Sequence, residues 1–185
     1  MATIGIKPNS TTSQTGWSAD PITNATDDDT TTFVTQSSTT CNWTAALSDL
    51  PSSSPDLSSA TINSFTISMN GKAGRAGAST CALSLVHSSD GPFATENESF
   101  TGTQSTQTTS ARTTQQDGSS ALTFAYINNC SVKLVPNNQG VTLYELFVTI
   151  DYTLGYSNTV NGVASANISK VNGVATANIS KVNGV

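Results

Sequence analysis

The chain has 185 residues, with 7 basic and 12 acidic side chains that give a net charge of −5 at pH 7. The basic residues are scattered, which excludes the clustered positive charge that binds a nucleic acid backbone. Only 10% of residues are charged, but β-branched and aromatic residues occur throughout, which favours a β-sheet protein over a disordered chain.

The first half of the chain reads as a polar start followed by short strands. Residues 1–30 are expected to form a loop or arm that leads into the sheet. Strands are predicted at 30–35 and 41–47, and the two prolines within 49–55 indicate a turn region after them. Apolar and polar side chains alternate in 61–69, which predicts a half-buried strand.

The second half continues this pattern. After a glycine-rich loop at 70–77, a strand is predicted at 81–86. Residues 101–120 are almost wholly Thr, Ser, Gln and Gly, which indicates edge strands or a long surface excursion. Strands are predicted again at 122–127 and 130–135.

The strongest strand signal covers residues 141–153. One face is wholly apolar or aromatic and is expected to be core; it carries Tyr144, Leu146, Val148, Ile150 and Tyr152. The other face carries Leu143, Glu145, Phe147, Thr149 and Asp151. About eight short strands without a helical stripe predict an all-β fold, a single jelly-roll-like β-sandwich over residues 31–155, with a plain Greek-key sandwich as the alternative.

The C-terminal segment, residues 156–185, is built on an 11-residue repeat. Two copies, at 160–170 and 171–181, differ only by Ser165 against Thr176, and a third copy begins at Val182. A unit this short cannot close a core by itself and is stable only when it stacks on other units or chains. The segment is therefore predicted to be an assembly arm.

Two conformations suit this arm. The Asn172-Gly173 pair favours a β-hairpin, whereas an apolar stripe with an 11-residue period would suit a supercoiled helix. Each internal glycine costs a helix about 1 kcal/mol relative to alanine, so β structure or an extended arm is preferred. Its apolar side chains are expected to contact partner chains; they are Val160, Val163, Ile168, Val171, Val174, Ile179 and Val182.

The chain lacks the apolar run of a membrane helix, and residues 1–8 lack the features of a signal peptide. Its cysteines, Cys41, Cys81 and Cys130, are odd in number and far apart. This spacing indicates neither a metal site nor a disulfide framework. Buried free thiols are expected, with one disulfide bridge as the alternative.

No catalytic constellation is indicated, and neither an enzymatic activity nor a cofactor is expected. His87 is the single histidine, so any nucleophile and base arrangement would have to use it. We expect it to be packed or solvated instead. Glu96 and Glu98 are expected to lie on a solvated strand edge, without a hydrolytic role.

Three consecutive aspartates, Asp27, Asp28 and Asp29, are the weak candidates for a metal site. Ca²⁺ takes six to eight oxygen ligands, which would have to come from several loops. A turn in which these carboxylates accept hydrogen bonds from nearby backbone amides is the favoured interpretation. No metal site is therefore predicted.

Two further pairs of residues are candidates for contacts with a partner. Lys72 and Arg75, on the glycine-rich loop, can pair with acidic groups of a partner protein, or they simply belong to a solvated loop. Trp17 and Trp43 can form a platform for a sugar ring, but tryptophans of a sandwich are more often core anchors.

The ordered motifs resemble the jelly-roll β-sandwich modules of tailed-bacteriophage virion proteins. The motifs are Gly16-Trp17, Asp27 to Val34, Leu47 to Pro51, Ala60 to Met69 and Val141 to Tyr152. The repeated Ile-Ser-Lys-Val-Asn-Gly-Val also resembles terminal repeats of phage structural proteins. The resemblance implies a non-enzymatic virion protein, assembled in the host cytoplasm.

We expect a capsid decoration, cement or head-fibre protein that binds other virion proteins, foremost the major capsid protein. A homo-oligomer is expected, with a trimer favoured, and neither nucleic acid nor membrane is an expected partner. A tail, collar or tail-fibre component, which would contact tail proteins, is the alternative within the virion. A carbohydrate-binding module for host-surface glycans is the alternative of another class.

Overall fold

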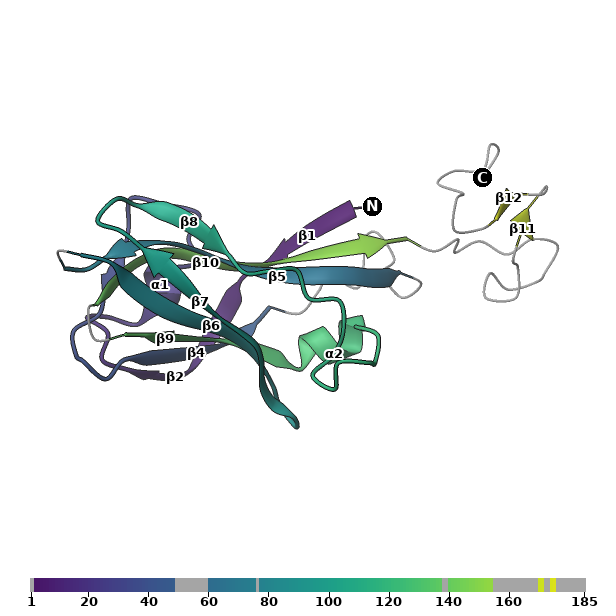
Figure 1. Cartoon of the computed structure of the whole chain (residues 1–185), viewed down its shortest axis with the longest axis horizontal. Coiled ribbons are helices and arrows are strands. Elements are labelled where there is room, and N and C mark those ends of the chain that lie inside the picture. Colours follow the sequence, from purple (N-terminus) through teal and green to yellow (C-terminus); the bar gives the residue numbers. More distant parts are fainter. Residues whose placement is uncertain are drawn as a thin grey trace.

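The computed structural model describes residues 2–48, 60–75, 77–137 and 140–154, together with the backbone of 170–171 and 174–175. Two five-stranded antiparallel sheets pack face to face and enclose one hydrophobic core (Figure 1). The predicted all-β sandwich is confirmed.

The first sheet, called sheet I, has the strand order β1-β10-β5-β8, and β3 also pairs with β10. Its strands are β1 (Ala2–Ile6), β3 (Val34–Thr35), β5 (Thr61–Ala73), β8 (Ser105–Thr108) and β10 (Val141–Thr153). Sheet II has the order β2-β4-β9-β6-β7. Its strands are β2 (Pro8–Thr15), β4 (Asn42–Leu47), β6 (Ser79–His87), β7 (Gly91–Phe100) and β9 (Cys130–Pro136).

Successive strands from β1 to β10 lie in different sheets except at the β6–β7 hairpin. The chain therefore crosses between the layers repeatedly, and each layer is built from segments that are distant in sequence. Each inner face contributes alternate apolar side chains to the core. The largest fully buried side chains are Trp43, Phe65, Phe100, Ile67, Met69, Leu83, Leu85, Ile127, Leu134, Leu143, Leu146 and Ile150.

Strand β10 departs from the predicted alternation at one point. The register with β5 shifts between Leu143 and Glu145, which marks a β-bulge. Because of this shift Leu143 joins the core, although its sequence position predicts the opposite face. Tyr144, expected in the core, is buried against Phe33 and Lys72 instead. Beyond the bulge Leu146, Val148 and Ile150 are buried as predicted.

The N-terminal segment is the largest correction to the predicted elements. Residues 2–15, expected within a loop or arm, form β1 and β2. β1 pairs with β10, and β2 pairs with β4. Both are edge strands with few buried side chains, so their sequences lack the apolar alternation by which a strand is usually identified.

Two short helices lie where a loop and a strand were predicted. α1 (Pro21–Asn24) begins at Asp20, whose carboxylate accepts a hydrogen bond from the Ile22 amide at 3.1 Å. α2 (Phe124–Asn128) lies where a strand was predicted at 122–127. The Thr123 hydroxyl caps this helix by accepting from the Tyr126 amide at 3.1 Å, and that local bond outweighs the β propensity of the segment.

The Thr-rich stretch 101–120 contains β8, an edge strand, as the composition indicates. β7 contains Glu96 and Glu98, which were expected on a strand edge, but its bounds were not predicted because its first two residues, Gly91 and Pro92, resemble a loop. In the repeat, β11 (Lys170–Val171) pairs with β12 (Val174–Ala175) on either side of Asn172-Gly173. This pairing agrees with the preference for β structure there; the rest of the arm lies outside the described residues.

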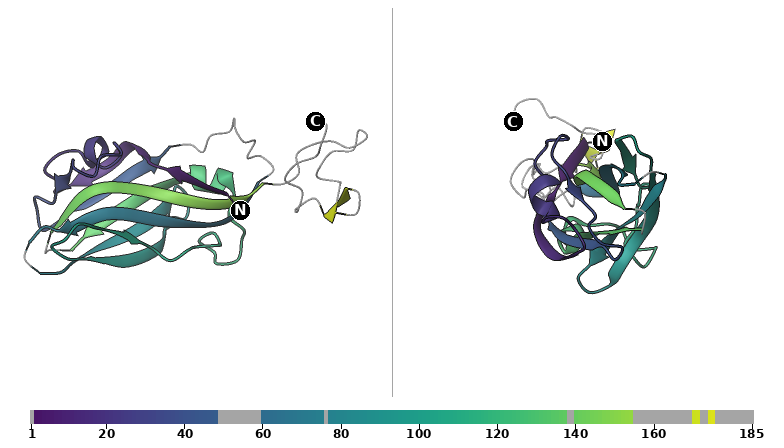
Figure 2. Two further views of the ribbon diagram at one scale, coloured as in Figure 1. Left: turned by 90° about the horizontal axis from the view of Figure 1, so that it is seen from above. Right: turned by 90° about the vertical axis from the view of Figure 1, so that its left-hand side faces the viewer.

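The sandwich is elongated and has two distinct ends (Figures 1 and 2). We call the end where β1 begins and β10 ends the terminal pole; there Ala2 pairs with Tyr152 and Thr61 with Thr153. The opposite end, the loop pole, is formed by residues 16–18, 36–41, 74–75 and 140–141. Neither described helix has the length that a membrane span requires.

Candidate functional site

The loop pole is tied together by backbone hydrogen bonds between segments that are distant in sequence. The Gly74 amide donates to the Gly140 carbonyl at 3.0 Å, and the Gln36 amide donates to the Val141 carbonyl at 3.0 Å. Gly16 has φ of +74°, and a side chain there would collide with the Thr40 carbonyl. The two backbone bonds place the glycine-rich loop, which carries Arg75, beside the loop that follows β3.

A small polar pocket opens at this pole. Thr142 of β10 and Thr35 of β3 are paired neighbours in sheet I, and both line it. The remaining lining residues are Gln36, Ser37, Ser38, Thr39, Gly74, Arg75, Gly140 and Val141. The lining is rich in hydroxyl and amide groups, so the pocket suits a polar ligand.

Gln36 connects the pocket to its walls. Its Nε2 donates to the Ser38 carbonyl at 2.7 Å and to the Asn137 carbonyl at 3.1 Å. Its Oε1 is buried and has no hydrogen-bond partner among the described residues. A buried acceptor without a donor costs the folded state free energy.

The predicted partner-contact residues Lys72 and Arg75 both lie at this pole. Lys72, near the end of β5, pairs across the sheet with Thr142 on the floor of the pocket. Its Nζ lies 5.6 Å from the centroid of the Tyr144 ring. Arg75 is exposed at the pocket edge. The structure therefore brings the two cations to one surface.

An aromatic pair, which sequence reasoning missed, adjoins Lys72. Phe33 is 49% exposed, and its ring centroid lies 5.5 Å from that of Tyr144, with 54° between the ring planes. Phe33 follows a run of three threonines and Tyr144 was assigned to the core, so no sequence signal joined them. The β10 bulge turns Tyr144 toward Phe33.

The two tryptophans pack in or against the core, as core anchors do. Trp43 is fully buried, and its Nε1 donates to the Thr11 hydroxyl at 2.9 Å. Trp17 packs partly buried against the core, and its Nε1 donates to the Asn42 carbonyl at 3.0 Å. Trp43 offers no open ring face, which corrects its candidacy as a glycan contact and makes it a core anchor.

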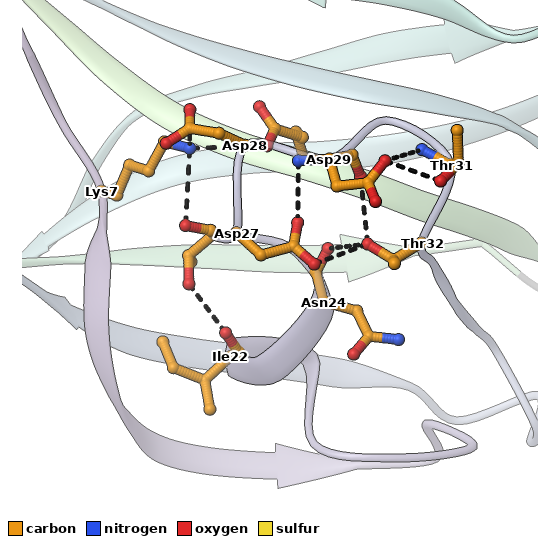
Figure 3. Close-up of polar contacts among 10 residues, drawn as sticks. Lys7, Ile22, Asn24, Asp27, Asp28, Asp29, Thr31 and Thr32 are labelled. Carbon is orange, nitrogen blue, oxygen red and sulfur yellow. Dashed lines mark hydrogen bonds and ion pairs between the residues drawn. The ribbon is translucent and has the colours of Figure 1, made fainter.

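The three aspartates lie in the turn between α1 and β3 (Figure 3). Asp27 Oδ1 accepts from the Asp29 amide at 3.0 Å, and Asp27 Oδ2 accepts from the Thr32 hydroxyl at 2.7 Å. Asp29 Oδ1 accepts from the Thr31 hydroxyl at 2.6 Å and from its amide at 2.8 Å, and these bonds lower the pKa of Asp29. Bonds of this kind are those of the favoured turn interpretation.

Asp28 turns away from its neighbours and forms an ion pair with Lys7 (Figure 3). The Lys7 ammonium also lies 3.4 Å from Glu145 Oε1 and 3.4 Å from the Thr26 carbonyl oxygen. Within the described residues, acidic, histidine and cysteine side chains form no group of three suited to a metal ion. The contacts of Lys7 with Asp28 and Glu145 fasten the turn to β10. The sequence did not indicate the part that Glu145 takes.

The remaining titratable candidates have packing contacts. The His87 ring stacks on Tyr126 at 4.1 Å between centroids, and its Nδ1 lies 3.2 Å from Asp90 Oδ2. Glu96 Oε2 accepts from the Ser110 amide at 2.9 Å. Burial, and secondarily the charge of Glu96, raise the pKa of Glu98. His87 joins the β6–β7 turn to α2, which agrees with its expected packed position.

All three cysteines are buried and free, as predicted. Burial raises the pKa of Cys41 and of Cys130 to about 12. It also raises the pKa of Cys81. These thiols remain protonated at neutral pH, so they are unsuited to act as nucleophiles.

The arm residues predicted to contact partners have no described side chains. Val171 and Val174 pair through their backbones in the β11–β12 hairpin. The other five, Val160, Val163, Ile168, Ile179 and Val182, lie outside the described residues.

No family model matches the chain, and no curated protein matches it. Among solved structures, the chain is similar to a truncated AlyQ with CBM32 and alginate lyase domains. The TM-score is 0.49 at 9% sequence identity, and the match covers 86% of this chain and 36% of the other. At this level of similarity no activity or ligand is transferred from that protein.

Proposed function

We propose that this chain is a non-enzymatic structural protein of a bacteriophage particle, a capsid decoration, cement or head-fibre protein. In this proposal the repeat arm holds the chain in a homotrimer or on the shell, and the sandwich makes protein contacts. Binding of many copies would stabilise the shell by burying interface area.

The observation that carries the proposal is the separation of the two poles. β10 ends at Thr153 on the terminal pole, and the repeat segment follows in the sequence. The loop pole, with its pocket and two cations, lies at the other end of the sandwich (Figure 1). An arm at one end and a polar contact surface at the other suit a module that is attached and displayed.

The thiols give independent support. Free buried cysteines suit a protein that folds and assembles in a reducing compartment, such as the cytoplasm of a host cell. Disulfide-bonded secreted domains of similar size generally use cysteine for stability instead.

The direct test is immunogold labelling and quantitative mass spectrometry of intact particles purified from the source culture. We expect labelled particles and a copy number comparable to that of the shell protein. A copy number of six or twelve per particle would move the chain to the tail or collar. Absence from purified particles, with the protein present in the soluble fraction, would overturn the virion assignment.

The arm is tested by deletion of residues 160–185. We expect the full chain to sediment as a trimer and the truncated chain as a monomer with an unchanged circular dichroism spectrum. A truncated protein that still forms the same oligomer and binds particles equally well would show that the repeat is not the assembly element.

Carbohydrate binding is the second candidate function, and the exposed Phe33 ring favours it. Aromatic rings that remain exposed beside polar groups offer a face on which a sugar ring can stack. Binding of any oligosaccharide that is lost in Phe33→Ala, with folding retained, would support this candidate.

A further inference from the structure

We propose that the loop pole binds a carboxylate-bearing saccharide, with Arg75 and Lys72 facing the carboxylate groups and Phe33 stacking on a sugar ring. This inference rests on the second candidate function and names its ligand class. It requires only the folded sandwich, whichever assembly displays it.

The aromatic part of the surface is Phe33 on its support, Tyr144. Phe33 precedes β3 and keeps about half of its side chain exposed, whereas Tyr144 beneath it is only 5% exposed. The tilted contact between the two rings holds Phe33 in place. A fixed, half-exposed ring loses little conformational freedom when a ligand stacks on it.

The charged part is the pair of cations. Neither Lys72 nor Arg75 has an acidic partner within 4.0 Å in the described part of the chain, although the net charge of the protein is −5. Lys7, by contrast, is neutralised by Asp28 and Glu145. Two unneutralised cations on one surface of an acidic protein attract an anionic ligand.

The polar part is the pocket, which Arg75 and Thr142 help to line. Thr142 lies across the sheet from Lys72, so the pocket floor and the cation over the Tyr144 ring are neighbours. The exposed residues 37–39 form the pocket edge together with Arg75. The hydroxyl groups of this edge can exchange hydrogen bonds with a sugar.

These features favour a saccharide over an acidic protein surface. The exposed large apolar side chains of the described residues are Phe33, Val135 and Leu154. They belong to different elements, whereas a stable protein interface buries about 800 Å² per partner around a cluster of apolar and aromatic anchors. One ring beside hydroxyl and amide groups matches the size and polarity of a pyranose.

The test uses the full chain and two probes of equal length and linkage, tetragalacturonate and the neutral α-1,4-galactotetraose. Binding is followed by isothermal titration calorimetry at low salt and by nuclear magnetic resonance of the ligand. We expect tetragalacturonate to bind and galactotetraose to bind at least about tenfold more weakly. Affinity for the uronate should fall as sodium chloride rises from about 20 mM to about 500 mM.

Matched variants locate the site. Arg75→Gln, Lys72→Gln and Phe33→Ala should each weaken uronate binding by about tenfold. Arg112→Gln and Lys133→Gln are the controls, because these residues lie outside the pocket and form no ion pair with described residues. The controls should bind as the unmodified chain does, and thermal melts establish that every variant is folded.

Four outcomes would overturn the inference. Equal binding of the two probes would leave carbohydrate binding standing but remove the acidic class. Binding to neither probe would remove both. Tight binding of a polyglutamate peptide without uronate binding would identify an acidic protein as the partner. Uronate binding that Arg112→Gln weakens as much as Arg75→Gln does would place the site elsewhere.

Discussion

β10 and β7 are both long strands of one sandwich, but β10 lies inside its sheet and β7 lies at the edge of the other. β10 is paired on both sides, with β5 along one edge and with β1 and β3 along the other. Its core-facing side chains, among them Leu146 and Ile150, are fully buried. β7 is the last strand of sheet II and pairs with β6 alone among the described strands.

The sequences of the two strands reflect this difference. β7 carries Pro92, a positive φ of 52° at Ala94, and the carboxylates of Glu96 and Glu98. Each of these features hinders the addition of another strand to an edge. The sequence of the central strand is therefore set by the apolar side chains that it buries. The sequence of the edge strand is set by residues that prevent a further strand from pairing with it.

The largest expected effect comes from a core truncation in the central strand. Leu146→Ala should lower the free energy of unfolding by about 2–5 kcal/mol, because it removes buried methyl groups and leaves a cavity. Ser99→Ala, on the exposed face of β7, should change it by no more than about 0.5 kcal/mol. Urea denaturation measures both. Similar losses in the two variants would mean that β7 is as constrained as β10.

The next effect concerns the buried carboxylate of β10. Lys7→Ala should lower the free energy of unfolding by about 1–3 kcal/mol, since Glu145 loses its cation while its side chain stays 11% exposed. In the double variant Lys7→Ala/Glu145→Gln part of this loss should return, because the buried carboxylate is replaced by a neutral amide, and only the exposed Asp28 remains without its cation. A double variant with strictly additive losses would show that Lys7 and Glu145 are not coupled.

A smaller effect, of opposite sign, is expected at the irregular position of β7. Ala94→Gly should raise the free energy of unfolding by about 0.5–1 kcal/mol, because glycine adopts the positive φ without strain. Ala82→Gly, in the paired strand β6, is the control and should lower it. If Ala94→Gly also lowers it, the backbone at position 94 is not strained.

The smallest effect is a pH dependence at Glu98. Since burial raises its pKa, the folded state binds the proton more tightly than the unfolded state, and stability falls as pH rises through this pKa, above the ordinary 4.5. Glu98→Gln should remove this fall, so its melting temperature should match that of the unmodified chain in acid and exceed it slightly at pH 7. Parallel melting curves against pH would contradict the assignment.

The alternation of apolar and polar residues predicted the strands that bury one face of side chains. It did not predict elements whose burial depends on segments remote in the sequence. The buried run of β10 was predicted because apolar alternation is a local signal. The free thiols were predicted because the odd number and wide spacing of the cysteines argue against a disulfide framework. β1 and β2 were missed because edge strands bury few side chains, and β7 was indicated only by the spacing of Glu96 and Glu98. α2 was assigned to a strand because one capping bond from Thr123 outweighed β-branched and aromatic composition.

The candidate site was predictable only in part. The glycine-rich loop marked Lys72 and Arg75 as accessible cations, and both lie at the loop pole. The tryptophans attracted attention because of their size, yet their large apolar surface draws Trp43 into the core. Phe33 and Gln36 could not be found in advance, because their significance depends on neighbours more than 100 residues away.

The sequence by itself determined the class of fold, because period-two alternation is set by neighbouring residues, and the number and spacing of the cysteines indicated free thiols. It also marked the arm as a repeat. The tertiary structure decided which strands lie at edges, where the β10 bulge reverses a face, and which aromatic ring remains exposed. Those features depend on pairing between distant segments. The sequence of a strand shows which of its faces is apolar, but not which strands pair with it.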